Sequence, residues 1–321
     1  MGGVFVDFFD SFSPDKVNLD SLRDSASHAQ YLTERRIVEI KEIADAAAEY
    51  ISAGIAGGLD LSTLLTLTFE NGALPPVTLN PDTIPEGIEA VKSSSYASMI
   101  YDKAELAALV ISALRGLGIK VDESAFLKVD ARDETVAYVK NPFADEAYDV
   151  FSTELSDPRV TYVKSFKEAL ALVDAGEVGY CLLPLEERGA RLSTVGELIF
   201  RGDFKINSVT PVFGFDGLAD MKYALVSKSF TIPTVDPDDD RYLEIRIGAG
   251  KCDVADVLLA AKRYNTTLYR INSAIYDIEG NHELYHSIVF RDDGGDFTEL
   301  LTYLTAFAVD YTPVGIYKNL E

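Results

Sequence analysis

The sequence predicts an α/β protein with a helical N-terminal region, a lobe built on a parallel or mixed sheet, and a C-terminal ferredoxin-like β-α-β-β-α-β module. Two patterns predict this order. Apolar residues recur at helical intervals in the first 130 residues, whereas short β-branched runs alternate with amphipathic segments from residue 134 onward. A stretch rich in proline and aspartate, TIPTVDPDDD, then separates the lobe from the module. The expected domains are residues 1–130, 131–232 and 240–321.

The N-terminal region is expected to consist of amphipathic helices. One long helix, or two, runs from Leu19 to about Ile51 and ends before a cluster of glycines. Asp60 is a candidate N-cap for a helix at 61–70, and a further helix covers 102–115. The prolines and asparagine between these last two helices indicate a loop.

The lobe is expected to alternate strands with helices, which is the pattern of a parallel sheet, and this sheet is expected to end near residue 230. Its expected strands are 135–140, 160–163, 178–184, 204–215 and 221–230, and its helices are 143–155, 166–176 and 193–202. The module's expected strands are 242–247, 266–277, 284–290 and 311–319, and its helices are 253–265 and 296–308.

The composition narrows the range of partners. The chain has 321 residues and 47% hydrophobic content, which is enough for buried cores of ordinary size. Its 52 acidic and 29 basic residues give a net charge of −23, whose field repels nucleic acid and anionic lipid, so we expect neither partner. Cys181 and Cys252 form no disulfide framework and the opening residues lack the features of an export signal, so we expect a cytoplasmic protein.

Two short motifs have a structural explanation that we prefer to a chemical one. HELYH at 282–286 matches a zinc-protease pattern, but it follows a turn and continues into SIVF, which predicts a strand instead of the required helix. GAGKC at 248–252 is similar to part of a phosphate-binding loop, although Ile245 stands where that loop needs a glycine. We expect a glycine turn there, and we expect neither a metal nor a cofactor.

The segment VGYCLLPLEERGA carries a resemblance to a known family. It is similar to the first lobe of prephenate dehydratase, where a strand leads into a Pro-x-Glu-Asn-Ser segment, and Pro184 and Glu186 match that segment. Phe143 and Ala147 match the family's Phe-Ser-Glu-x-Ala helix start, and KYALVS resembles its returning strand. The C-terminal module stands where this family carries an ACT domain, which in the family binds phenylalanine at a dimer interface. The resemblance covers about residues 134–321.

This resemblance implies a divergent enzyme of phenylalanine biosynthesis, which removes water and carbon dioxide from prephenate. The residues that it implies are catalytic Glu186, Lys222 and Tyr223, with Asn141, Glu187 and Arg188 as substrate contacts. In the ACT-like module it implies amino acid binding by Gly250, Lys251, Asn272 and Ser273. It also implies a small-molecule substrate or amino acid effector, and a homodimer paired through ACT domains.

Several positions depart from the family pattern. The family's threonine is replaced by Met221, which cannot donate a proton, and its Asn-Ser pair by Glu187 and Arg188. Only GFDGLAD separates the strands between which the family inserts a second lobe, so the N-terminal region is a candidate for the missing wall of the cleft. The alternative is a non-catalytic descendant that binds an amino acid or pairs subunits, with Glu186, Glu187 and Arg188 in a solvated turn.

Overall fold

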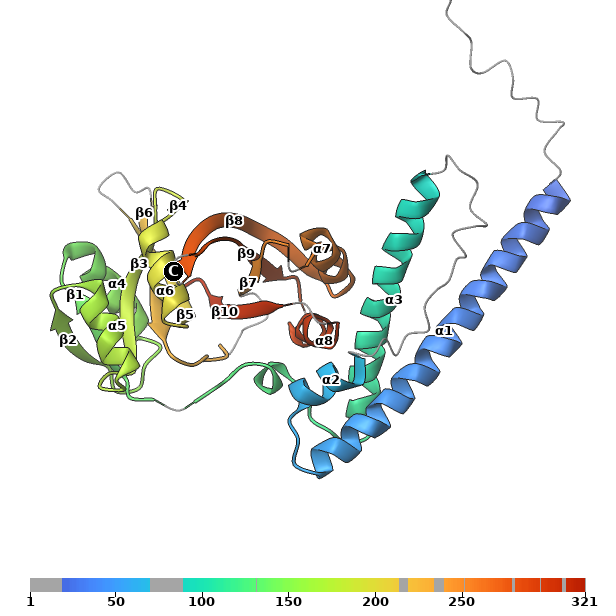
Figure 1. Ribbon diagram of the computed structural model, residues 1–321. Helices are drawn as coiled ribbons and strands as arrows, with labels where there is room; N and C mark the ends of the chain where they lie inside the picture. The colour runs from blue at the N-terminus through green and yellow to red at the C-terminus, as the bar shows by residue number, and fades with distance from the viewer. Residues whose placement is uncertain are drawn as a thin grey trace, which may run out of the picture.

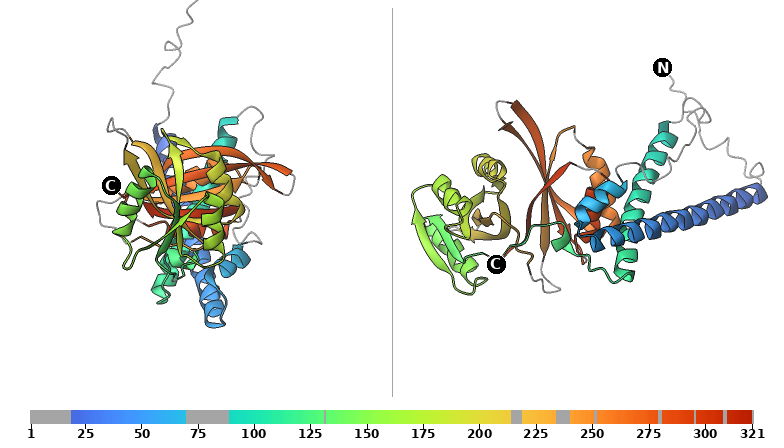
Figure 2. Two further views of the ribbon diagram at one scale, coloured as in Figure 1. Left: turned by 90° about the vertical axis from the view of Figure 1, so that its left-hand side faces the viewer. Right: turned by 60° about the horizontal axis from the view of Figure 1, so that its bottom comes forward.

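The computed structural model describes residues 19–69, 89–130, 132–213, 219–233, 240–250, 252–278, 281–294, 296–307 and 310–320. Within these ranges the chain runs from a helical region through an α/β lobe to a ferredoxin-like module (Figure 1). The module lies in the middle, with the helical region on one side and the lobe on the other (Figures 1 and 2). No helix in these ranges is long and apolar enough to cross a membrane.

The helical region consists, as far as the structure describes it, of α1 (Leu19–Ala56), α2 (Leu61–Phe69) and α3 (Glu89–Gly116). The segment from Leu19 onward is therefore one long helix. Asp60 caps α2 as predicted, because its carboxylate accepts hydrogen bonds from the Thr63 amide (2.8 Å) and the Thr63 hydroxyl (2.7 Å). The three helices share a buried apolar core that includes Ile51, Leu65 and Ile111.

The lobe alternates strands and helices as predicted. Its elements are β1 (Thr135–Val139), α4 (Pro142–Ser152), β2 (Arg159–Val163), α5 (Phe166–Asp174), β3 (Tyr180–Glu187), β4 (Ala190–Arg191), α6 (Ser193–Arg201), β5 (Lys205–Phe213) and β6 (Ala219–Ser227). Strands β2, β1 and β3 are parallel, and β6 and then β5 join them antiparallel, so this part of the sheet is mixed. A short 3-10 helix, η3 (Glu123–Ala125), lies between α3 and β1.

The C-terminal module has the predicted ferredoxin-like order. Its elements are β7 (Arg241–Gly248), α7 (Val254–Arg263), β8 (Thr266–Ile278), β9 (Asn281–Asp292), α8 (Thr298–Ala306) and β10 (Tyr311–Lys318). Its strands lie in the order β10-β7-β9-β8. The HELYH motif lies on β9, which confirms the predicted strand. The GAGKC motif connects β7 to α7, and Gly250 adopts a positive φ of 80° there, which confirms the predicted glycine turn.

One prediction about the sheet is wrong, because the sheet does not end near residue 230. In the described residues ten strands form one sheet in the order β2-β1-β3-β6-β5-β10-β7-β9-β8, with β4 paired to β3. The lobe joins the module through β5 and β10, which pair in parallel with Ile206 opposite Gly315. A Cβ atom added to Gly315 would lie 2.9 Å from the Cβ and the carbonyl oxygen of Ile206. The glycine is therefore what allows the two strands to come this close.

The module's part of the sheet has two unlike faces, because side chains alternate along each strand. Ile245 of β7 points to the face that packs on α7, α8 and α3 in a large apolar core. Glu244 and Arg246 on either side of it point to the opposite face, toward the lobe. The lobe helix α6 covers part of this second face, where Phe200 stacks on Tyr276 with 4.6 Å between ring centroids.

Candidate functional site

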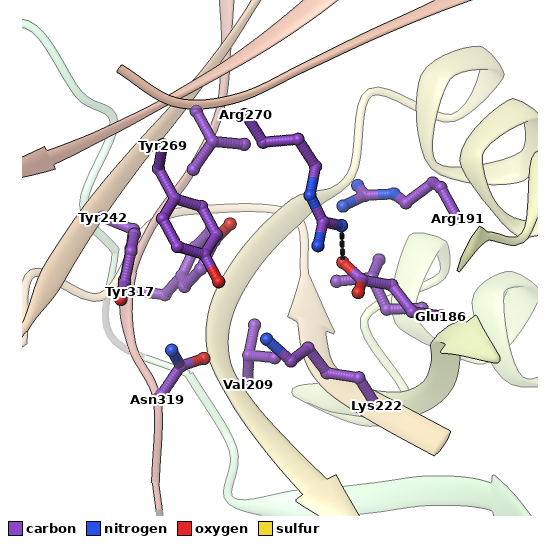
Figure 3. Close-up of a pocket in the computed structure, with 11 residues that line it drawn as sticks. Glu186, Arg191, Val209, Lys222, Tyr242, Tyr269, Arg270, Tyr317 and Asn319 are labelled. Atoms are coloured by element: carbon purple, nitrogen blue, oxygen red, sulfur yellow. Dashed lines mark hydrogen bonds and ion pairs between the residues drawn. The ribbon is translucent and has the colours of Figure 1, made fainter. Parts of the chain in front are cut away.

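A pocket lies where the lobe meets the second face of the module's sheet, and we name it the junction pocket (Figure 3). The lobe contributes the charged residues Glu186 from β3, Arg191 from β4 and Lys222 from β6. The module contributes Tyr242 from β7, Tyr269 and Arg270 from β8, and Tyr317 from β10. The pocket therefore exists only because the two parts of the sheet are continuous.

Strand pairing brings the three charged residues of the lobe together. Glu186 lies directly opposite Lys222 on one side and opposite Arg191 on the other, and side chains directly opposite one another share a face of the sheet. The register of β3 against β6 shifts between Pro184 and Glu186. This irregularity allows Glu186 to face the same side as the apolar residue before it, Leu185, and both line the pocket.

The predicted Glu186–Arg188 segment is divided by the structure. Glu186 is only 7% exposed, and its carboxylate accepts a hydrogen bond from Arg270 Nη1 at 2.5 Å. The alternative in which Glu186 lies in a solvated turn is therefore wrong for this residue. Glu187 and Arg188 are exposed, and Arg188 and Gly189 both have positive φ, which forms the tight turn between β3 and β4.

Arg191 is anchored across the junction by a fully buried carboxylate. Its guanidinium donates to both oxygens of Glu244, at 2.9 and 3.3 Å. The Ser287 hydroxyl donates to Glu244 Oε1 at 2.6 Å, and the Tyr317 hydroxyl donates to Glu244 Oε2 at 3.4 Å. Glu244 is 0% exposed, so these partners replace the water that the carboxylate loses on burial.

Lys222 differs from Arg191 and Arg270 in its contacts with the described residues. It is half-buried, and it makes no hydrogen bond or ion pair with the residues that the structure describes. Burial lowers the pKa of Lys222, Glu186 opposes this decrease, and Arg270 and Arg191 add to it. Among the described residues that line the pocket, the cations Arg191, Lys222 and Arg270 outnumber the carboxylate Glu186, and Glu244 behind the wall pairs with Arg191, so positive charge is in excess at Lys222.

Two tyrosines of the pocket wall remain neutral hydrogen-bonding groups. Burial raises the pKa of Tyr242 to about 12, and burial also raises the pKa of Tyr317 well above its ordinary value. Their hydroxyls therefore keep their protons at neutral pH. The two rings stack with their centroids 5.8 Å apart, which adds an apolar surface to one side of the charged cluster.

The remaining predicted catalytic and substrate residues lie elsewhere. Tyr223 follows Lys222 directly on β6, so its side chain points to the opposite face of the sheet, where it packs against α4. Its hydroxyl donates to Asn141 Oδ1 at 3.4 Å, and Asn141 also caps α4 by accepting from the Ala144 amide at 3.0 Å. The structure thus brings Glu186 and Lys222 together, but it does not bring Tyr223 or Asn141 to them.

The predicted amino-acid-binding residues are also spread out. Asn272 and Ser273 point to opposite faces of β8, since they are adjacent on a strand. The Ser273 hydroxyl hydrogen-bonds to His286 Nδ1 at 2.9 Å on an exposed surface, whereas the Asn272 amide nitrogen is buried with no partner in the described part of the chain. Gly250 is exposed in the loop before α7, and Lys251 lies outside the described residues.

Within residues 19–69 and 89–130, the structure does not support the hypothesis that the N-terminal region supplies a wall of the cleft. The residues lining the junction pocket come from the lobe and the module. The helical region packs instead on α7 and α8, on the other face of the module's sheet, where the Tyr264 hydroxyl donates to the Ala104 carbonyl at 2.7 Å. In the described residues no group of three or more His, Cys, Asp or Glu side chains is arranged to hold a metal ion.

Sequence reasoning missed Arg191, Arg270 and the tyrosines of the pocket. A signal for them was present, because the strand segments YLEIRI and TTLYRINSA carry charged residues where a strand of a packed module is expected to be apolar. Charges at such positions need buried partners. The charged partners of Glu244 and Arg270 come from the lobe, and they identify the face on which the two parts meet.

No protein-family model and no curated protein matches the chain. Among solved structures, the chain is similar to prephenate dehydratase from Streptococcus mutans, at 14% identity and a TM-score of 0.44, over 58% of this chain and 98% of that one. It is similar to prephenate dehydratase from Arthrobacter aurescens in complex with L-Phe, at 13% identity and a TM-score of 0.42, over 57% and 89%. It is also similar to GqqA, described as a novel type of quorum quenching acylases, at 16% identity and a TM-score of 0.42, over 58% and 95%. These similarities assign no activity, ligand or partner to this chain.

Proposed function

We propose that this protein binds a small carboxylate, such as an amino acid or a related organic acid, in the junction pocket, and that it acts as a binding protein without catalysis. The observation that carries the proposal is Lys222, a half-buried cation with no partner in the described residues, within a pocket where positive charge is in excess. A carboxylate satisfies both the charge and the hydrogen-bonding capacity of this ammonium group.

The walls around Lys222 include apolar side chains. Tyr242 and Tyr269 lie against each other edge to face, with 4.9 Å between ring centroids, and both line the pocket. Val209 and Val289 add apolar surface. Aromatic and aliphatic side chains therefore share the pocket wall with the charged groups, and small-molecule sites combine these two kinds of lining.

The arrangement favours binding over the reaction that the sequence resemblance implies. Tyr223 lies on the other face of the sheet, so it is unable to act on a ligand beside Lys222. Glu186 already accepts a hydrogen bond from Arg270, and it has to exchange this partner before it can protonate a leaving hydroxyl. Met221 stands where the family's threonine is expected and supplies no proton.

A divergent prephenate dehydratase is the second candidate function. The observation that favours it is the burial of Glu186 opposite Lys222, since an acid beside a cation is what a dicarboxylate substrate with a leaving hydroxyl requires. In this case Glu186 protonates the leaving group, and Lys222 and Arg270 hold the carboxylates.

The Lys222→Met substitution is expected to weaken carboxylate binding by about 10- to 100-fold, because a hydrogen bond to a charged group contributes about 1.5–3 kcal/mol. Calorimetric titration with amino acids, phenyllactate and prephenate measures this, with Lys128→Met as the control, since the Lys128 side chain is 77% exposed outside the pocket. Unchanged affinity in Lys222→Met contradicts the proposed site.

A separate assay tests the second candidate. The protein is incubated with prephenate, and the formation of phenylpyruvate is followed. If phenylpyruvate forms with the unmodified protein but not with Glu186→Gln, the second candidate is established instead.

The C-terminal module is proposed to be an ACT-like regulatory module that pairs two subunits. Support comes from β8, a long strand at the edge of the sheet with exposed Ile271 and Ile275, beside exposed Leu284 of β9. Gel filtration with light scattering is expected to give the mass of a dimer. A monomeric mass at micromolar concentration contradicts the proposed pairing, but it does not bear on the proposed binding in the junction pocket.

A further inference from the structure

The space inside the junction pocket is small. It leaves room for about one water molecule between the lining side chains. Tyr269 in the pocket wall is 47% exposed, so the pocket borders solvent and dissolved ions reach it. A space of this size receives a single ligand atom, which is one oxygen of a carboxylate, the oxygen of a water molecule, or a monoatomic ion.

Side chains that end in hydrogen-bond donors surround this space. Lys222 comes from β6, Tyr269 and Arg270 come from β8, and Asn319 follows β10. Figure 3 shows the Lys222 nitrogen, the Tyr269 hydroxyl and the Asn319 amide turned toward one another across the pocket. These three groups have no hydrogen-bond partner in the described residues, and Arg270 keeps further N–H groups after it donates to Glu186. Donors from separate strands therefore converge on one position.

The pocket also carries positive charge that its own carboxylate does not balance. Arg191 is held by Glu244 behind the wall and Arg270 is held by Glu186, whereas Lys222 has no ion pair in the described part of the chain. A water molecule at this position satisfies hydrogen bonds but brings no charge. An anion does both, and its attraction to a half-buried ammonium group is stronger than the same attraction in bulk water.

We infer that a halide ion, which is chloride in ordinary salt solutions, binds in the junction pocket beside Lys222. The inference rests on the cation that carries the proposed function, and it names the ion that takes this position when no carboxylate is bound. A halide ion is spherical and has no proton to donate, so it accepts hydrogen bonds from Lys222, Tyr269 and Arg270 together. It also needs only the space of a single atom.

The overall charge of the protein makes halide binding elsewhere on the described surface weak. The chain has a net charge of −23, and its field repels anions. Exposed lysines such as Lys120 and Lys128 lie beside the carboxylates of Asp122 and Asp130, which offset their charge. A bound halide therefore indicates a local excess of positive charge such as the one at Lys222.

Chlorine NMR of sodium chloride solutions tests the inference on the full chain. Chloride that exchanges rapidly with a protein site gives a broadened resonance, so we expect excess linewidth when the unmodified protein is added. Sodium acetate is expected to remove this excess as its concentration rises, because an acetate oxygen and chloride compete for one position. This competition is measured on the unmodified protein and does not depend on any variant folding.

Three variants assign the broadening to a site. Lys222→Met is expected to weaken chloride binding at least about tenfold, because it removes a charged hydrogen-bond donor. Tyr269→Phe removes one hydroxyl and no charge, and it is expected to weaken chloride binding several-fold. Lys128→Met is the control and is expected to keep the excess linewidth, since it removes an exposed cation outside the pocket. Chloride affinity that is unchanged in both Lys222→Met and Tyr269→Phe overturns the inference.

Calorimetric titration with acetate separates the failure of this inference from the failure of the proposed function. Acetate binding without any chloride broadening overturns the halide site and leaves the proposed function intact. Chloride broadening that is lost in Lys222→Met, without any acetate binding, supports the halide site and overturns the proposed carboxylate binding. The absence of both signals overturns both.

Discussion

Replacing Arg241 with methionine is expected to lower the free energy of unfolding by about 3–5 kcal/mol, which is the usual cost of leaving a buried ion pair without one partner. Arg241 begins β7 and is 7% exposed. Its two terminal nitrogens donate to Glu123 of η3 at 2.6 and 2.9 Å, and one of them also lies 3.2 Å from Asp292 Oδ2 of β9. Methionine fills much of the same volume but leaves two buried carboxylates near one another.

The surroundings of Glu123 explain why the loss is expected to be large. Burial raises the pKa of Glu123, and Arg241 and the Phe297 amide, which donates to Glu123 Oε1 at 2.8 Å, oppose that increase. Without Arg241 the opposing contribution is mostly removed, so the carboxylate has to take up a proton or remain an uncompensated buried charge. Either outcome costs stability at neutral pH.

Urea unfolding followed by circular dichroism measures the effect, and Arg159→Met is the matched control. Arg159 pairs with Asp133 and Asp157, but its side chain is 59% exposed, so removing it is expected to cost at most about 1 kcal/mol. Equal midpoints for the two variants, with unchanged slopes, contradict the expectation that the buried ion pair between Arg241 of β7 and Glu123 of η3 stabilises the fold.

The Glu244→Gln substitution is expected to lower the stability of the protein and to raise its affinity for a carboxylate. The free energy of unfolding falls by about 3–5 kcal/mol, because Arg191 loses its buried counter-charge at the junction between lobe and module. The affinity of the remaining folded protein for a carboxylate rises several-fold, because the net positive charge of the junction pocket increases by one. A purely structural role for Glu244 predicts the first effect without the second.

Glu187→Gln is the control for Glu244→Gln, since Glu187 is exposed on β3 next to the pocket residue Glu186. Its stability is expected to change by no more than about 0.5 kcal/mol. Unfolding in urea and titration with phenyllactate at low temperature, where both variants remain folded, give the two readouts. An affinity that falls in Glu244→Gln contradicts the charge assignment of the pocket.

The order of elements was predictable because it follows from local signals. Asp60 caps α2 where the sequence places an N-cap, and the strand through HELYH was recognised from the turn before it and the apolar run after it. The ferredoxin-like order of the module follows from the alternation of its segments alone. None of these features depends on contacts between distant parts of the chain.

The features that create the candidate site do depend on distant contacts. The continuity of the sheet rests on a close approach between Ile206 and Gly315, and nothing in either strand segment alone indicates its partner. Motif matching grouped Lys222 with Tyr223 because they are adjacent in sequence, whereas adjacent residues on a strand face opposite ways. Arg270 reaches Glu186 only because the module's sheet lies against the lobe.

The position of β10 in the sheet affects how the protein folds during its synthesis. β10 lies between β5 and β7 in the middle of the sheet, although it is synthesised after every other described strand. While the ribosome extends the chain from Ile206 to Gly315, the edge of β5 that will receive β10 remains open. An open strand edge is a template for pairing with other chains. We therefore expect the nascent protein to be most prone to aggregate at this stage, and a chaperone that covers the edge of β5 to prevent that aggregation.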